Sequence, residues 1–548
     1  MRRTSLVGGL LACTVLASSV WARSVPQEPK PGSAWYEDKV DLGFKIKTPK
    51  DWEFVPASPL ERNMIGRYAA PNGQYVNLGR EEFVLVTMYL VKFDARPKEE
   101  GTTIQDGNKT IEISMAGAPD IDTWMDGGID EGNSWERLEA AKPIKGAGFE
   151  GTFAIYEGKS TRGRGEDPQP VHAYVADFKV SKDVHVAVVG LGPGDKKWRN
   201  YEKAYETIAK SIQRLEVAGA AKAVSGDPRG EKRAKLQNEV AKSPGWALYE
   251  TPNYFIVSSY NDKQFIEEMK TRLEGIRAVY EQHYPPATAR RIKVDMDPDE
   301  DDPGATPAEP ETKPAEPAPE EHTTTQTILD PMELSRTSVV RVCKDREEYM
   351  RYGGSPSTGG YWNWVEQELV IYDDKNNQGT AYTWGVLNHE AFHQYIFYFY
   401  GNLSPHSWYN EGTGDYYFGF EYKNGKYKEG PSRERQHTLV DLIGSNRYVP
   451  LRDFVKWSKS QYYGNNTGNG RGGGKVEGYE AYAQGWSLIW FLRTGAGKAK
   501  GWQKSWETIL PRYLDTLLDT GSTKKAVEAA YADVDWDAFE ASWLDYTH

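Results

Sequence analysis

The chain has 548 residues, of which 39% are hydrophobic and 13% aromatic, and its formal net charge is −12. This length exceeds one compact domain, so we expect roughly two to four folded units. The acidic balance and the lack of a long basic tract argue against nucleic acid as a partner. The 18 Trp and 34 Tyr supply large apolar areas for cores and for the walls of a cleft.

The first residues have the pattern of an export signal. Two arginines precede an apolar run from Leu6 to Val20, and the small residue Ala22 follows. We therefore predict a signal peptide over residues 1–22 and an exported, periplasmic or secreted protein. No later run reaches the roughly 20 apolar residues of a membrane span, so we expect no transmembrane segment.

Cleavage after residue 22 would leave 65 basic and 79 acidic side chains, a net charge of −14, with Cys343 as the only thiol. No intrachain disulfide could then form. A second interpretation of the signal is a lipoprotein, because Leu-Leu-Ala before Cys13 resembles a lipidation site. In that case Cys13 would carry a lipid anchor.

Residues 34–216 have the pattern of a separate β-rich α+β unit. Alternating apolar residues predict strands, and a helical repeat predicts a closing helix at 201–212. The strongest strand signals are at 43–47, 83–91, 172–176 and 185–189. His172 and His185 fall on strands, where we interpret them as ordinary polar or packed residues. Residues 217–243 are rich in Ala, Lys, Gly and Glu and predict a partly helical linker.

The opening Gly-Phe-Lys-Ile-Lys-Thr-Pro-Lys-Asp-Trp at 43–52, the strands and the closing helix resemble a PsbP/Mog1-like sandwich. PsbP is a photosystem oxygen-evolving protein. This resemblance implies a fold and at most a binding role for residues 34–216, and it implies no reaction.

A second unit is expected over residues 244–548. Its first half predicts strands at 254–258, 291–294 and 338–342 and helices at 263–284 and 347–352. Residues 297–325 form an insertion whose first 25 residues hold seven Pro and ten acidic residues against one Lys. Such a segment cannot bury enough apolar surface to fold, so we predict a disordered acidic Pro-rich loop. Residues 359–364 and 368–372 then predict a hairpin, whose edge strand could hold an extended peptide by main-chain pairing.

Residues 384–396 predict a buried helix, because apolar side chains recur at three- and four-residue spacing. On this helix His389 and His393 lie one turn apart and can bind a single ion. Glu390 lies beside the first histidine, where a carboxylate can take a proton from water held by the metal. The pattern His-Glu-x-x-His also occurs by chance, so the residues that follow it decide its meaning.

Seventeen residues separate His393 from Glu411, which is enough for a second helix to return and offer Glu411 as the third ligand. Asp415 is one turn further on and can accept the free ring N–H of a ligand histidine. Gly412 and Gly414 each cost a helix about 1 kcal/mol relative to Ala. That cost is expected where two helices must approach closely.

His-Glu-Ala-Phe-His-Gln at 389–394 and Trp-Tyr-Asn-Glu-Gly-Thr-Gly-Asp-Tyr-Tyr at 408–417 together resemble the gluzincin zinc metallopeptidases. The match is to aminopeptidase N-like and thermolysin-like enzymes, and most of all to exported bacterial peptidase-MA-like proteins. It implies a zincin-like catalytic domain, with a small mixed sheet, an active-site helix and a mainly helical lower lobe. It also implies Zn²⁺ on His389, His393 and Glu411, Glu390 as general base, and Asn410 and Asp415 orienting the two histidines.

Residues 478–492 predict another helix, on which Tyr482-Ala-Gln-Gly is similar to the Tyr-x-Lys-Gly of aminopeptidase N-like enzymes. This similarity implies that the Tyr482 hydroxyl stabilises an oxyanion, whereas the simpler interpretation is a core aromatic. Tyr479 and His437 are the substitutes if Tyr482 faces away. The Gly-x-Met-Glu-Asn sequence that binds a free amino terminus in those enzymes is absent, which favours an endopeptidase over an aminopeptidase.

The sequence therefore predicts an α+β multidomain protein that acts as an exported zinc-dependent peptidase on protein or peptide substrates. Two alternatives stay open. The chain could be a catalytically silent, zinc-stabilised cell-envelope binding protein, or the N-terminal domain could be the functional module that binds peptide or polysaccharide.

Overall fold

The computed structural model describes residues 28–547, except 58–60, 71–74, 79–80, 85, 96–101, 107–108, 114–116, 128–134, 161–168, 220, 222–226, 290–330, 357, 365, 402, 464–469 and 471–474. The predicted signal peptide 1–22, Cys13, the strand at 291–294 and the insertion 297–325 lie outside these residues. Within the described part, no helix is long and apolar enough to cross a membrane.

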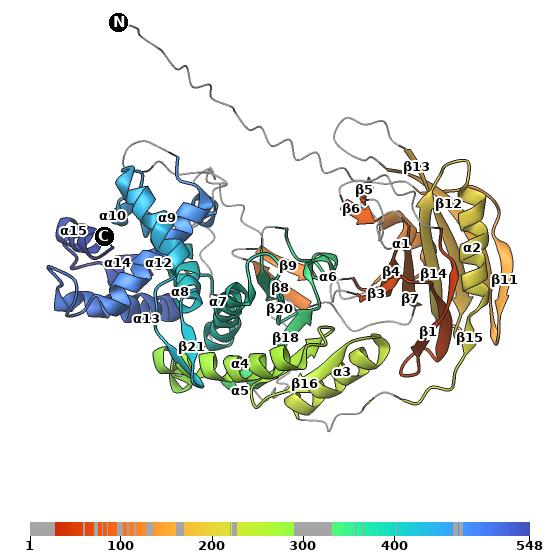
Figure 1. Cartoon of the computed structure of the whole chain (residues 1–548), viewed down its shortest axis with the longest axis horizontal. Helices are drawn as coiled ribbons and strands as arrows, with labels where there is room; N and C mark the ends of the chain where they lie inside the picture. The colour runs from red at the N-terminus through yellow and green to blue at the C-terminus, as the bar shows by residue number, and fades with distance from the viewer. Residues whose placement is uncertain are drawn as a thin grey trace, which may run out of the picture.

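The chain is an α+β protein with several sheets, and Figure 1 shows its parts in a row. A β-rich unit stands at one end, a helical lobe stands at the other, and a five-stranded sheet lies between them. This arrangement agrees with the predicted α+β multidomain class.

The N-terminal unit is built on an antiparallel sheet with strand order β10-β12-β13-β14-β7-β4-β3, and β11 also pairs with β12. Its strands are β3 (Glu53–Pro56), β4 (Met64–Ala69), β7 (Thr87–Asp94), β10 (Glu136–Arg137), β11 (Lys142–Gly146), β12 (Phe149–Ser160), β13 (Gln169–Lys179) and β14 (Val184–Pro193). The predicted strands at 172–176 and 185–189 are the centres of β13 and β14. They pair directly, with Val175 opposite Val189.

A second sheet and a helix complete this unit. The sheet has the order β1-β2-β15, from β1 (Pro31–Asp38), β2 (Phe44–Pro49) and β15 (Gln213–Arg214). Helix α2 (Trp198–Lys210) buries Tyr201, Tyr205 and Ile208 in the core that both sheets share. The remaining elements are β5 (Tyr75–Leu78), β6 (Glu81–Val84), β8 (Thr102–Asp106), β9 (Lys109–Ile113) and α1 (Ile121–Gly127).

One predicted strand of this unit was wrong. The run at 83–91 was expected to be continuous, but the structure divides it into β6, which pairs with β5, and β7, which lies in the large sheet. The break is at Val86, whose φ is 72°. A branched residue rarely adopts this angle, and an apolar run alone contains no signal for it.

The second unit begins with a five-stranded sheet of order β16-β17-β18-β20-β19. Its strands are β16 (Ala247–Glu250), β17 (Tyr254–Ser258), β18 (Ser338–Cys343), β19 (Gly360–Asn363) and β20 (Glu368–Tyr372). The pairs β17·β18 and β18·β20 are parallel, whereas β19 pairs antiparallel with β20 and forms the edge. The predicted hairpin is therefore confirmed, with β19 as the edge strand.

Helices cover both faces of this sheet. Helices α4 (Lys263–His283) and α7 (Thr380–Tyr400) bury their apolar residues together with Ile256, Val340 and Leu369. The opposite face packs against α3 (Pro228–Lys242) and α6 (Arg346–Arg351) through Leu236 and Tyr349. Short turns η1 (Pro286–Thr288), α5 (Pro331–Leu334) and η2 (Ser335–Thr337) flank α4 and β18.

The linker predicted at 217–243 is shorter than expected. Its second half is helix α3, which begins at an Asp227 cap with Pro228 in its first turn. Leu236 of this helix is fully buried. Glu239 forms an ion pair with Arg341 of β18, with 2.8 Å between Oε1 and Nη1. The helix therefore belongs to the second unit.

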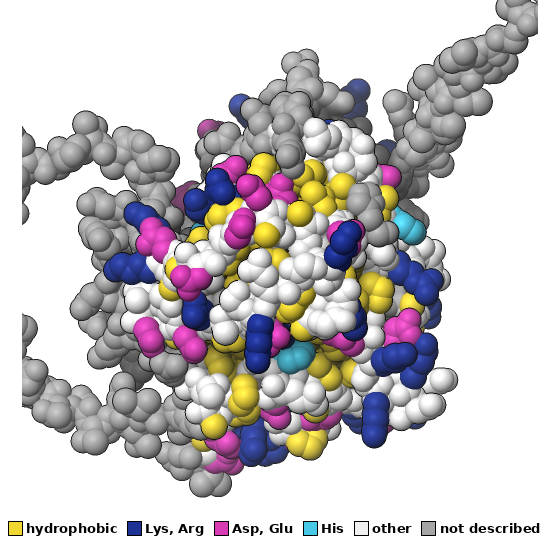
Figure 2. Space-filling model, turned by 90° about the vertical axis from the view of Figure 1, so that its left-hand side faces the viewer, with side chains coloured by type: hydrophobic (Ala, Val, Ile, Leu, Met, Phe, Trp, Pro, Cys, Tyr) yellow, Lys and Arg dark blue, Asp and Glu magenta, His cyan; other side chains and the backbone are white. Residues whose placement is uncertain are grey.

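The helical lobe follows α7 in the chain and shares one core with it. Its helices are α8 (Ser407–Phe418), α9 (Arg433–Gly444), α10 (Leu451–Phe454), α11 (Lys459–Tyr462), α12 (Gly478–Thr494), η3 (Lys504–Thr508), α13 (Ile509–Thr520), α14 (Thr523–Ala530) and α15 (Trp536–Thr547). A small hairpin, β21 (Glu421–Lys423) and β22 (Lys426–Lys428), follows α8. On the face at this end of the molecule, basic and acidic side chains are interspersed (Figure 2).

Candidate metal centre

Helix α7 is buried on nearly every side, which explains its almost continuous apolar sequence. Its neighbours fix its position. Tyr280 of α4 donates a hydrogen bond to the carbonyl of Asn388, and the Gln394 amide donates to the carbonyl of Val339 in β18. His389 and His393 therefore have a rigid support, and their Nε2 atoms lie 3.0 Å apart.

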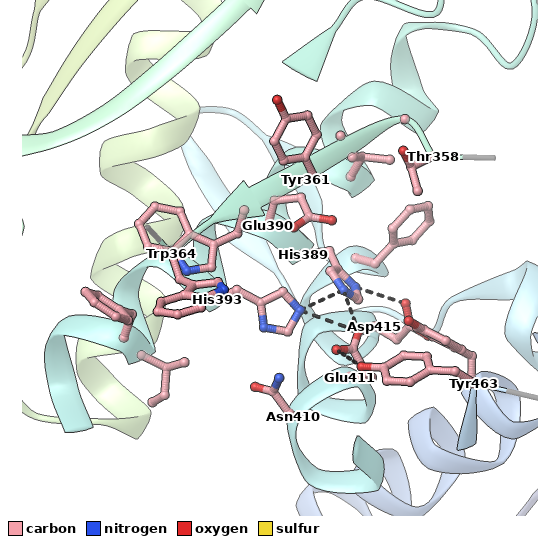
Figure 3. Close-up of a pocket in the computed structure, with 18 of the residues that line it drawn as sticks. Thr358, Tyr361, Trp364, His389, Glu390, His393, Asn410, Glu411, Asp415 and Tyr463 are labelled. Atoms are coloured by element: carbon pink, nitrogen blue, oxygen red, sulfur yellow. Dashed lines mark hydrogen bonds and ion pairs between the residues drawn. The ribbon is translucent and has the colours of Figure 1, made fainter. Parts of the chain in front are cut away.

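Helix α8 brings the third side chain to this point. Glu411 Oε2 lies 3.3 Å from Nε2 of His389 and 3.6 Å from Nε2 of His393. The three side chains offer ligand atoms that all lie within 4.8 Å of one another, as Figure 3 shows. Two helices that are separated in the chain thus place two imidazoles and one carboxylate around a common point.

The two glycines of α8 allow this approach. A Cβ atom at Gly414 would lie 2.7 Å from Cε1 of the His389 ring. A Cβ atom at Gly412 would lie 2.6 Å from the carbonyl oxygen of Gly485 in α12. Each glycine costs the helix about 1 kcal/mol relative to Ala. The close contact of α8 with α7 on one side and α12 on the other accounts for that cost.

A buried carboxylate fixes the protonation of the first histidine. Nδ1 of His389 lies 3.1 Å from Asp415 Oδ1 and donates to it, so Nε2 is the ring nitrogen that faces Glu411. Asp415 is held in turn by Arg435 of α9, whose Nε donates to Oδ2 at 2.7 Å. Asp415 is buried, and Arg435 lies with its guanidinium 5.2 Å from the Tyr482 ring centroid.

These donor atoms fit a zinc ion. Nitrogen and oxygen ligands bind zinc at about 2.0–2.1 Å in a tetrahedron, which places neighbouring ligand atoms about 3.3 Å apart. The three separations in the structure are 3.0, 3.3 and 3.6 Å. Two neutral imidazoles and a carboxylate leave one of four positions open, which is the pattern of catalytic rather than structural zinc sites.

The neighbouring side chains stabilise the charged forms of His389 and Glu411. Burial lowers the pKa of His389, but hydrogen bonds to Asp415 and Glu411 outweigh burial and raise it above its ordinary value. Burial raises the pKa of Glu411, but the two histidines outweigh it and hold that pKa well below the ordinary value. Each group is therefore poised to carry its charge only because the others are near.

Glu390 lies on the side of the histidines that faces the edge strand, as Figure 3 shows. The backbone N–H of Trp362 in β19 bonds to its carboxylate. Burial raises the pKa of Glu390, and the charge of Glu411 adds to this rise, although the two histidines oppose it. A raised pKa makes this carboxylate a stronger base than an ordinary one.

A cavity of about 900 Å³ opens over the three ligand side chains and Glu390. It is bounded by β19, by α7 and the loop after it, by α8, by α11, and by the starts of α9 and α12. Its other lining residues are Thr358, Gly359, Gly360, Tyr361, Trp362, Trp364, Tyr382, Val386, Ile396, Phe397, Tyr400, Gly401, Leu403, Ser404, Asn410, Asp415, Phe418, Ser432, Glu434, Arg435, Lys459, Tyr463, Gly478, Tyr479 and Tyr482.

Tyr482 and its two substitutes, Tyr479 and His437, differ in their position relative to the cavity. Tyr482 is partly buried and lines the cavity, with its ring 5.2 Å from Tyr462 and 6.1 Å from Tyr463 between centroids. Burial raises its pKa, and the charge of Glu411 raises it further. Tyr479 is 59% exposed at the cavity rim. His437 lies exposed on α9 and is not among the described residues that line the cavity.

Asn410 differs from its implied role. Its side chain points into the cavity below His393 (Figure 3). Within the described part of the chain it makes no hydrogen bond to either histidine. Gln484, at the position of the lysine in the Tyr-x-Lys-Gly pattern that this segment resembles, is buried. Its amide accepts from the N–H of Val449 and donates to the carbonyl of the same residue.

Sequence reasoning missed two functional candidates. The Tyr463 hydroxyl donates to Glu411 Oε1 at 3.0 Å, and Arg435 fixes Asp415. Tyr463 directly follows the short helix α11, and it has no spacing relation to any motif. Arg435 is one of several basic residues in a polar helix. Only the fold brings either side chain to the site.

No family model matches the chain, and no curated protein matches it. Among solved structures, cyanobacterial PsbP from Synechocystis is similar at 12% identity and a TM-score of 0.22, covering 33% of this chain and 92% of that one. The Ran-binding protein Mog1p of Saccharomyces cerevisiae is similar at 10% identity and a TM-score of 0.19, covering 32% of this chain and 91% of that one. A Bacteroides thetaiotaomicron protein is similar at 9% identity and a TM-score of 0.19, covering 47% of this chain and 72% of that one. Such low TM-scores assign no family, so the site is interpreted from its own geometry.

Proposed function

We propose that this protein is an exported zinc-dependent peptidase with a zincin-like catalytic unit, and that it cleaves within peptide chains. The observation that carries the proposal is the convergence of His389, His393 and Glu411, with Glu390 beside them in a large cavity. A purely structural metal site would need neither an open position nor an extra carboxyl group next to it. The exported state rests on the pattern of residues 1–22.

Three side chains would hold the metal: His389 and His393 from α7, and Glu411 from α8. A zinc ion bound there would supply the Lewis acidity that polarises a peptide carbonyl and makes water more acidic. Asp415 and Arg435 would act on the metal only through His389, by fixing which ring nitrogen carries the proton.

Glu390 is the general base in this proposal. Its carboxylate removes a proton from a water molecule while the water oxygen attacks the carbonyl carbon of the peptide bond. The same carboxyl group then gives the proton to the leaving amine nitrogen as the C–N bond breaks. The water is thereby divided between the two products, its hydroxyl on the new carboxyl group and its proton on the new amine.

Two phenols are candidates for stabilising the negative charge that develops on the carbonyl oxygen. Tyr463 is the stronger candidate, because its hydroxyl is already 3.0 Å from Oε1 of the ligand Glu411. Tyr482 lies behind it, with its ring against Tyr463 and under Arg435. One donor of this kind is typically worth about 10²–10³ in kcat.

Cleavage within chains is favoured over removal of terminal residues by the extent of the cavity. Trp364 and Tyr463, which both line it, lie on opposite sides of the histidines in Figure 3. Residues on both sides of a cleaved bond could therefore lie in it. The outer edge of β19, whose Trp362 N–H faces Glu390, could pair with an extended substrate.

The test compares the purified mature chain with its Glu390→Gln variant after zinc loading, using a mixed proteome digest read by mass spectrometry. We expect both proteins to hold one zinc per chain and only the wild type to generate new peptide termini. Cleavage by the variant at the wild-type rate would remove Glu390 from the mechanism. A wild type that binds zinc and cleaves nothing would instead support the silent binding protein.

A further inference from the structure

Two kinds of side chain line the cavity, and one half of it is lined without charged side chains. This half adjoins His393 and is built by β19, the end of α7 and the loop after it. Its large side chains are Trp362, Trp364, Ile396, Phe397, Tyr400 and Leu403. The rings of Trp362 and Phe397 pack with 5.6 Å between centroids, so the edge strand and α7 form one continuous wall.

The other half is polar and charged. Beside His389 the cavity is lined by Asp415, Glu434, Arg435 and Lys459, together with the hydroxyls of Tyr463 and Tyr479. Trp364 lies on the opposite side of the histidines from Tyr463 and Asp415 in Figure 3. A charged substrate side chain could find a partner on the Lys459 side, whereas on the Trp364 side it would lose water without compensation.

We propose that the uncharged half is a subsite for one large apolar or aromatic side chain of the substrate, and that it sets the cleavage specificity. This inference rests on the proposed peptidase function and adds the substrate class. Aromatic and branched walls remove the apolar surface of such a side chain from water. The amide of Asn410 points into the cavity below His393 and can offer a hydrogen bond to the substrate main chain.

The direction of β19 places this subsite relative to the cleaved bond. The strand runs from Gly360, beside Val386 and Glu390, to Asn363, next to the aromatic wall. Antiparallel pairing is the more stable ladder. A substrate paired in this way runs opposite to β19, so the residues that precede the cleaved bond lie toward Trp364. The apolar side chain therefore belongs to the residue on the amino-terminal side of that bond.

The test uses a peptide series that differs at one position, with Phe, Leu, Ala, Glu or Lys in turn. Cleavage sites and kcat/KM are measured for zinc-loaded wild type, and binding of the same peptides is measured with the Glu390→Gln variant. We expect kcat/KM about 10–100-fold higher for Phe or Leu than for Glu or Lys, with cleavage directly after the varied residue. Equal rates for all five peptides, or a preference only after the cleaved bond, would overturn the proposal.

A charge variant makes the test specific to this wall. Leu403→Lys places a cation on a partly exposed loop position of the subsite. The ratio of kcat/KM for Phe over Glu should fall at least 10-fold. Val440→Lys is the matched control, since Val440 is 39% exposed on α9 outside the cavity, and it should keep the wild-type ratio. An unchanged ratio in Leu403→Lys would overturn the subsite.

The binding measurement separates the two proposals. If wild type cleaves no peptide but Glu390→Gln still binds Phe peptides about 10-fold more tightly than Glu peptides, the peptidase function fails and the apolar subsite stands. If peptides are cleaved without any preference, the peptidase function stands and the subsite fails.

Discussion

A single methyl group added at Gly414 should affect zinc binding and the stability of the fold in different ways. Replacement of glycine by alanine inside a helix normally stabilises the helix by about 1 kcal/mol. At Gly414, however, the new Cβ atom would lie 2.7 Å from Cε1 and 2.8 Å from Nδ1 of His389. The imidazole must therefore move away from α8, or α8 must move away from α7.

The size of the effect follows from these distances. Ordinary contact between two such carbon atoms begins at about 3.5 Å, so the ring must shift by almost 1 Å. Metal–ligand distances tolerate deviations of about 0.2 Å. The shift also strains the hydrogen bond from Nδ1 of His389 to Asp415, which is 3.1 Å long. We expect Gly414→Ala to weaken zinc binding at least 10–100-fold, as loss of such supporting contacts commonly does.

The assay is zinc competition with a chromophoric chelator, run beside urea unfolding of the metal-free protein. Gly444→Ala is the matched control, because Gly444 is the last residue of a helix and has nothing within 4 Å of the added Cβ. It should keep full zinc affinity. If Gly414→Ala binds zinc as tightly as wild type, the close approach of α8 to His389 is not what positions the ligand.

Three further changes test other parts of the account. Tyr463→Phe should keep one zinc per chain and lower kcat about 10²–10³-fold with little change in KM, whereas a normal kcat would exclude this phenol from the reaction. Arg341→Met removes the ion-pair partner of the buried Glu368 and of the partly exposed Glu239. It should reduce the free energy of unfolding by about 3–5 kcal/mol in urea titrations, against less than about 1 kcal/mol for the exposed Arg336→Met. Burial lowers the pKa of His406 to about 4, so the unfolded chain binds the extra proton first and stability falls as the pH drops from about 6.5 toward 4. The wild type should lose up to about 1.4 kcal/mol per pH unit more than His406→Asn in this window, and parallel pH profiles would contradict the buried neutral imidazole.

The convergence of His389, His393 and Glu411 could be predicted because the position of each side chain depends on local helix geometry. His389 and His393 must share a face once their segment is helical, and only the return of the chain had to be guessed for Glu411. The glycines of α8 were a second local signal, since a helix tolerates Gly412 and Gly414 only where something packs against it. The structure shows that these neighbours are α12 and the His389 ring.

The remaining parts of the site depend on tertiary contacts that no periodic pattern in the sequence reveals. Tyr463, directly after α11, reaches Glu411, and Arg435 of α9 reaches Asp415, and neither segment carries a motif. Helix α3 was taken for linker because its apolar moment is weak, and only Leu236 and Ala234 are buried in it. Its place on the sheet depends on charge pairing with Arg341, which a composition-based prediction cannot register.

In the proposed function, two neighbouring helices of this chain create a catalytic zinc site. The most direct measurement is diffraction from crystals of zinc-loaded protein, with data collected on both sides of the zinc absorption edge. The account predicts one anomalous peak within about 2.0–2.2 Å of His389 Nε2, His393 Nε2 and a carboxylate oxygen of Glu411. A peak at other residues, or none between these three side chains, would contradict it.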